Sequence, residues 1–120
     1  MEKPAKENIV VVKSYAFAHR IVKAYQYLTK IKHEFVLSNQ LLRSGTGIGA
    51  NIREGVNAQS KKEFISKLNI ALNEAHESDY WISLLRDGGY FTLKEAASLL
   101  KDVDELIRLL TAIIKSSKKN

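Results

Sequence analysis

The chain has 120 residues with 19 Lys or Arg against 13 Asp or Glu, which gives a formal net charge of +6 and favours an anionic partner. It has no cysteine, which excludes disulfide frameworks, thiolate metal sites and cysteine nucleophiles. With 45% hydrophobic residues, one proline, no apolar run long enough to span a membrane and no signal-peptide segment, it is expected to be a single globular domain of the cytoplasm.

A first long helix is predicted over residues 8–32, after a flexible segment at 1–7, because this stretch lacks Gly and Pro and repeats apolar residues at helical spacing. The apolar residues fall in two stripes, Val10, Phe17, Ile21, Ala24, Leu28 and Ile31, and Tyr15, Ala18, Val22 and Tyr25. A helix this long carries more apolar surface than the core of one small subunit covers.

A second helix is predicted over residues 38–55, and its middle contains Gly45, Gly47 and Gly49. This spacing lacks the preceding strand of a dinucleotide fingerprint and the Lys-Ser/Thr pair of a Walker loop. A nucleotide site is therefore disfavoured. We interpret Gly45 and Gly49, one turn apart, as a place where another helix approaches closely.

Polar residues of the second helix fall on shared faces. Ser44 and Asn51 are separated by two turns, and Arg43 and Glu54 by three. Because polar groups inside a bundle or an interface need partners, we interpret these residues as a network that fixes helix register, with a binding site as the alternative.

Two further helices have clear start signals. Ser60–Glu63 and Thr92–Glu95 are capping boxes, and Gly88 and Gly89 end the third helix. Four helices with short connections predict an all-α, antiparallel up-down-up-down four-helix bundle over residues 8–115. A basic C-terminal tail, 116–120, is expected to follow.

The first helix carries Lys13, Arg20, Lys23 and Lys30 within about 100° of its circumference, and residues 8–33 contain no acid. These cations suit the phosphates of RNA or DNA, together with Lys115, Lys118 and Lys119 of the tail. The third helix is rich in acids, so pairing of the charges between helices or subunits is an equal alternative.

Enzymatic chemistry has no positive signal. No serine lies in a nucleophile-elbow motif, and Glu74, His76 and Glu77 lack the Glu-x-x-His spacing of di-iron bundles. We expect a protein that is not an enzyme and holds no metal and no cofactor.

Residues 40–55, Gln-Leu-Leu-Arg-Ser-Gly-Thr-Gly-Ile-Gly-Ala-Asn-Ile-Arg-Glu-Gly, resemble the central signature of the bacterial four-helix-bundle family of 23S rRNA intervening-sequence proteins, loosely labelled a ribosomal protein family. The matching positions are Arg43, Ser44, Ile48, Asn51, Ile52, Glu54 and Gly55. The segment 60–64, Glu77 and the run 80–85 also resemble the family. Two departures occur: Gly47 replaces a common Ser, and Asn73-Glu74 replaces a frequent Gly-Ser, which implies a bulkier third helix.

The resemblance spans about residues 8–115 and implies a homopentamer around a central opening, with no catalytic residues. It also adds Glu77 to the polar network of the bundle or oligomer. A related accessory protein of diversity-generating retroelements is thought to engage nucleic acid and a reverse transcriptase. We therefore expect a homo-oligomer that binds RNA or DNA through its basic face; the alternative is a scaffold or adaptor for protein partners.

Overall fold

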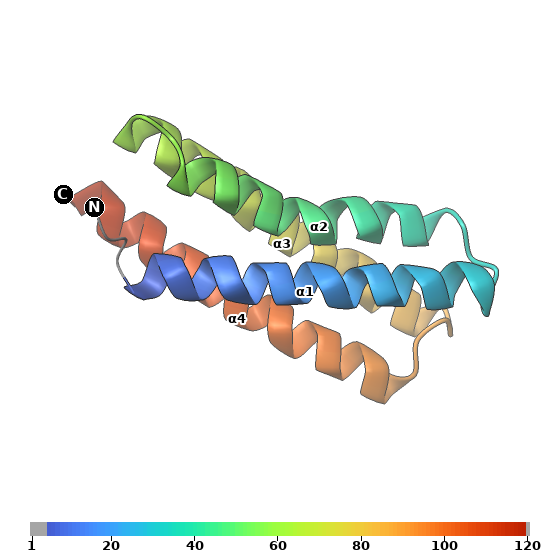
Figure 1. Cartoon of the computed structure of the whole chain (residues 1–120). Coiled ribbons are helices and arrows are strands. Elements are labelled where there is room, and N and C mark those ends of the chain that lie inside the picture. Colours follow the sequence, from blue (N-terminus) through green and yellow to red (C-terminus); the bar gives the residue numbers. More distant parts are fainter. Residues whose placement is uncertain (1–4, 120) are drawn as a thin grey trace.

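The computed structural model describes the backbone of residues 5–119 and the side chains of residues 9–119, and it forms an antiparallel up-down-up-down bundle of four helices (Figure 1). The helices are α1 (Ala5–Lys30), α2 (Leu37–Val56), α3 (Lys61–Asp87) and α4 (Leu93–Lys119). No strand occurs in the described part of the chain. The predicted fold class is confirmed.

Each helix packs against two neighbours. α1 contacts α2 and α4, α3 contacts the same two helices, and α1 does not contact α3. The bundle measures 46 × 20 × 19 Å. Because α1 and α3 lie on a diagonal, their outer surfaces face away from each other.

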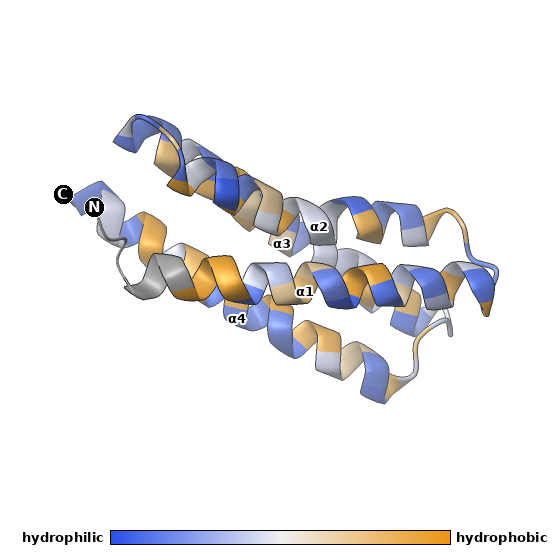
Figure 2. Cartoon of the chain, in the orientation of Figure 1, coloured by the Kyte–Doolittle hydropathy of each residue, from blue (hydrophilic) through white to orange (hydrophobic). Residues whose placement is uncertain are grey.

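The core is built from one apolar stripe of each helix. On α1, Phe17, Ile21 and Leu28 are at most 1% exposed, as the first predicted stripe requires. Ile31, the last residue assigned to that stripe, is 65% exposed because α1 ends at Lys30 and not at 32, so this part of the prediction is wrong. The second stripe lies farther out, with Tyr15 63% and Val22 39% exposed. One subunit therefore leaves part of the apolar surface of α1 uncovered, and Figure 2 shows that the coloured part of α1 begins with a strongly hydrophobic stretch.

The glycines of α2 face different neighbours. A Cβ atom on Gly45 would lie 2.7 Å from Cγ1 of the buried Ile21, and one on Gly49 would lie 3.4 Å from the backbone oxygen of Ser14. Both of these neighbouring residues belong to α1 of the same chain. The predicted close approach of another helix is confirmed at Gly45, and that helix is α1. At Gly49 a Cβ atom would make an ordinary van der Waals contact, so the prediction does not hold there.

The helix ends differ from the predicted ones. α1 begins at Ala5, within the segment predicted to be flexible, of which residues 1–4 lie outside the described residues. α4 continues to Lys119, so residues 116–119 of the predicted tail are helical, while Asn120 lies outside the description. No Gly or Pro follows Leu93, and Ile113 and Ile114 still pack on the core, so nothing ends the helix earlier.

The capping box at the start of α4 forms in both directions, and at the start of α3 the bond to the Ser60 side chain is present. Thr92 N–H donates to Glu95 Oε1 at 2.8 Å and Glu95 N–H to Thr92 Oγ1 at 3.0 Å, which completes the reciprocal pair. At the start of α3, Glu63 N–H donates to Ser60 Oγ at 3.1 Å.

The start of α2 is held by Glu34, a side chain that the sequence analysis did not single out. Its carboxylate accepts the N–H groups of Val36, Leu37 and Ser38 at 3.2, 3.0 and 2.7 Å, and Ser38 Oγ donates to the Glu34 carbonyl oxygen at 2.7 Å. Burial raises the pKa of Glu34, but these hydrogen bonds outweigh it, so the pKa is held below its usual value.

Replacing Glu34 with Gln should lower the free energy of unfolding by about 1 kcal/mol at neutral pH, the usual value of a helix N-cap. The folded-state pKa of Glu34 is depressed, so its contribution is present above about pH 4.5 and is lost as the pH falls through the folded pKa. Urea denaturation at pH 7 and at acid pH should therefore show the two proteins converging in acid. Glu63→Gln, an exposed position, is the control; an equal effect there would refute the special role of Glu34.

Candidate nucleic-acid interface

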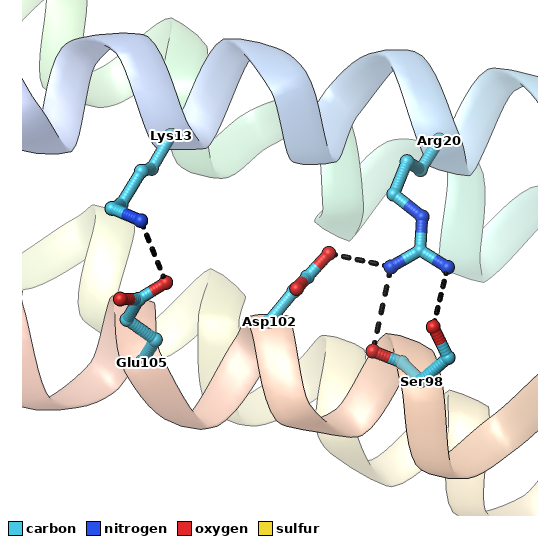
Figure 3. Close-up of polar contacts among 5 residues, drawn as sticks. All are labelled: Lys13, Arg20, Ser98, Asp102 and Glu105. Atoms are coloured by element: carbon cyan, nitrogen blue, oxygen red, sulfur yellow. Dashed lines mark hydrogen bonds and ion pairs between the residues drawn. The ribbon is translucent and has the colours of Figure 1, made fainter.

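Two of the four predicted cations of α1 bind acids of α4. Lys13 Nζ lies 3.1 Å from Glu105 Oε1, and Arg20 Nη1 lies 2.6 Å from Asp102 Oδ2 (Figure 3). Arg20 also donates to Ser98, from Nη2 to Oγ at 2.8 Å and from Nη1 to the carbonyl oxygen at 3.4 Å. Pairing between helices, the alternative interpretation of these charges, therefore describes Lys13 and Arg20, with α4 and not the acidic α3 as the partner.

These ion pairs remain close to solvent. The Lys13 and Arg20 side chains are 44% and 41% exposed, and their carboxylate partners are exposed to a similar degree. Exposed pairs contribute about 0–1 kcal/mol each. These two ion pairs therefore join α1 to α4 only weakly.

Lys23 and Lys30, the other two predicted cations, are exposed and form no ion pair with any described side chain. They follow Arg20 toward the C-terminal end of α1. The structure thus divides the predicted group into one half that joins α1 to α4 and one half that faces solvent.

α4 adds a row of cations, of which only Lys115 was predicted from the sequence. Lys94, Lys101, Arg108 and Lys115 recur every seven residues and are all exposed. Seven residues make nearly two helical turns, so neighbours in the row are about 10 Å apart. The seven-residue spacing of these cations can be recognised in the sequence. It is less obvious because acids lie between them, such as Asp104, which pairs with Arg108 at 3.0 Å.

Lys94 and Lys101 are exposed on the outer side of α4, opposite its buried stripe. They alternate at helical spacing with Ser98 and Glu105, which bond to α1. Neither lysine forms an ion pair with a described side chain. We call the surface that carries Lys23, Lys30, Lys94 and Lys101 the basic face.

The predicted polar network is not continuous. Ser78 Oγ lies 3.0 Å from Ser44 Oγ, and Lys67 Nζ lies 3.1 Å from Glu54 Oε1, so Ser44 and Glu54 each join α2 to α3. The remaining three members bond within their own helices: Asn51 to the Gly47 carbonyl oxygen at 2.8 Å, Glu77 to Trp81 Nε1 at 3.2 Å, and Arg43 to Gln40 at 3.5 Å.

The two departures from the family pattern meet in space. A Cβ atom on Gly47 would lie 2.6 Å from Glu74 Oε2, so the carboxylate of α3 occupies the space that a side chain of α2 would fill. Burial and the neighbouring Glu77 raise the pKa of Glu74, and Arg43 lowers it to a smaller extent. A small residue on α2 therefore accommodates the bulkier α3.

A groove of about 660 Å³ runs along α1 and α2 and contrasts with the basic face. Tyr15, Ala18, Gly49 and Ala50 line it, together with Arg53, whose guanidinium lies 5.7 Å from the centre of the Tyr15 ring. Most of this lining is small or apolar. Such a surface suits packing against protein more than binding to phosphate.

A metal site and a membrane span would each show a characteristic feature among the described residues. Within the described part of the chain, no three His, Asp or Glu side chains gather in a way that suits a metal ion. None of the four described helices combines the length and hydropathy that a membrane span requires.

Comparisons with known proteins agree with the fold. A family model described as 23S rRNA-intervening sequence protein matches residues 6–112. The structure is similar to a crystal structure from Bacteroides thetaiotaomicron, a protein of unknown function from the S23 ribosomal protein family, with 52% identity and a TM-score of 0.91 over 92% of this chain and 98% of that chain. No curated protein matches the sequence.

The proximity of Gly47 and Glu74 predicts that the two positions are energetically coupled. Gly47→Ser should stabilise the protein by about 0.5–1 kcal/mol more in a Glu74→Ser background than in the wild type, because the serine then meets no carboxylate. Urea denaturation of the four proteins measures this difference. Equal effects of Gly47→Ser in both backgrounds would show that the two residues are independent.

Proposed function

Since the chain belongs to the 23S rRNA-intervening sequence protein family, we propose that it is a non-enzymatic, cytoplasmic protein that forms a homo-oligomer and binds RNA or DNA through its basic face. One observation carries the proposal. Lys23 and Lys30 of α1 and Lys94 and Lys101 of α4 are exposed on two neighbouring helices, without ion pairs to described side chains.

The arrangement suits a phosphate backbone. Cations on two neighbouring helices can contact phosphates along a strand or across a groove, and such contacts give affinity without reading sequence. Lys13 and Arg20 add less to this surface, because the carboxylates of Glu105 and Asp102 beside them repel a phosphate. The electrostatic contribution of the phosphate contacts to the binding free energy falls as the salt concentration rises.

Exposed apolar side chains support assembly of the homo-oligomer. Val12 and Tyr15 are 68% and 63% exposed on α1, and Ile70 and Leu84 are 41% and 39% exposed on α3. Because α1 and α3 face away from each other, contact between these two surfaces is heterologous, and heterologous contacts that close form rings. A pentamer is the ring that the resemblance to the family implies.

A second candidate function is that of an oligomeric scaffold or adaptor for protein partners, without direct contact to nucleic acid. The groove along α1 and α2 favours it, because its small and apolar lining suits a protein surface. Lys13 and Arg20 also favour it, because these two of the four cations predicted to bind phosphate already pair with acids of α4.

Replacing Lys23, Lys30, Lys94 and Lys101 together with Gln should weaken binding to labelled structured RNA and duplex DNA. Anisotropy titrations at several salt concentrations should show a shallower slope of log K against log salt, by up to about 0.9 for each phosphate that the variant no longer neutralises. The matched control replaces Arg43, Arg53, Lys61 and Lys62, which are exposed on α2 and α3 and carry the same total charge. Equally weakened binding by both variants, or no binding by the wild type at low salt, would favour the scaffold.

Replacing Val12 and Tyr15 with Lys should dissociate the oligomer, because it places charge on the exposed apolar surface of α1. Sedimentation velocity at micromolar concentration measures the change. The wild-type oligomer should persist at high salt, since its contacts are mainly apolar. A wild-type protein that sediments as a monomer would contradict assembly, and dissociation by salt alone would place the charged residues in the interface.

A further inference from the structure

A groove between α1 and α4 lies within the basic face and has no role in the function proposed above. Its volume is about 380 Å³, within the size range of small-molecule sites. α1 contributes Lys23, Ala24 and Tyr27, and Phe91 and Glu95 line the opposite side. α1 and α4 pack together more sparsely than the other neighbouring helices do, and they diverge toward the α1–α2 loop (Figure 1).

The inside of this groove is apolar and has an aromatic wall. Phe91 and Leu99 are each 5% exposed, so they form a floor that belongs to the core. Tyr27 is half-buried and lines the groove together with the small Ala24, and Lys32 Nζ lies 6.0 Å from the centre of the Tyr27 ring. A planar ring fits such a site by stacking, the usual way in which proteins hold unpaired bases.

Charge at the mouth of the groove gives the ligand an orientation. Lys23 and His19 lie on the α1 side, whereas the Glu95 carboxylate, which holds the Thr92 N–H at 2.8 Å, lies on the α4 side. A phosphate is attracted by Lys23 and repelled by Glu95. The phosphate group therefore belongs at the outer edge of α1, and the neutral ring belongs inside.

We propose that this groove accepts an unpaired base of a nucleic-acid strand whose phosphates lie on the basic face. The inference rests on the nucleic-acid binding proposed above. Bases of a regular duplex are stacked within it and enter a pocket only at the cost of being extruded, whereas a bulged or single-stranded base enters at little cost. The protein accordingly prefers strands with unpaired nucleotides to perfect duplexes.

The test compares an RNA hairpin that contains one bulged 2-aminopurine with the same hairpin fully paired. The full-length protein should bind the bulged hairpin about tenfold more tightly, and stacking on Tyr27 should quench the 2-aminopurine fluorescence. Tyr27→Phe retains the ring and should retain this preference. Tyr27→Leu retains apolar bulk without a ring and should bind the bulged hairpin as it binds the paired one.

A second measurement on the wild type guards against unfolding of Tyr27→Leu, which circular dichroism would reveal. Photo-crosslinking from 4-thiouridine at the bulge should label residues 19–27 or 91–99; labels confined to other segments overturn the inference. Equal affinity for both hairpins overturns the base site but leaves the basic face standing. Binding of neither hairpin overturns both proposals. If free AMP binds as tightly as the bulged hairpin, the ligand is a free nucleotide. This result contradicts the proposal that the bound base belongs to a nucleic-acid strand.

Discussion

The packing of α1 against two neighbours, and not three, governs the rest of this molecule. Phe17, Ile21 and Leu28 fill the core, and the remaining circumference of α1 is divided between α2 and α4. Toward α2 it presents Tyr15 and Ala18 beside small residues, and toward α4 it presents cations. One helix thus supplies both a surface suited to protein and a surface suited to phosphate.

The charged residues lie at the weaker of these two contacts, which is that of α1 with α4. α1 and α4 are joined at their surface by Lys13–Glu105 and Arg20–Asp102, and exposed ion pairs of this kind contribute little stability. Their exposure leaves this contact polar, and the divergence of the helices leaves the groove beside Tyr27. The loose packing between α1 and α4 lowers the stability of the bundle little, because the closer packing of α2 with α1 and α3 holds the fold together.

The neighbours of α2 explain its unusual composition. Gly45 admits Ile21 of α1, while Gly47 admits the Glu74 carboxylate of α3. Glycine in the middle of a helix costs about 1 kcal/mol relative to alanine. Here the cost is offset by the approach of helices on both sides. The glycine stretch is therefore a packing feature, and the departure at Gly47 accompanies the departure at Glu74 where α2 and α3 meet.

Local signals in the sequence determined the four helices, the caps at Ser60 and Thr92, and the buried stripe of α1, because helical periodicity and capping depend on residues a few positions apart. The family signature of residues 40–55 could also be read directly. The tertiary structure alone decided that Arg20 pairs with Asp102 and Lys13 with Glu105, both far along the chain. These relations depend on which helices become neighbours, and a repeat within one helix carries no information about the helix that packs against it.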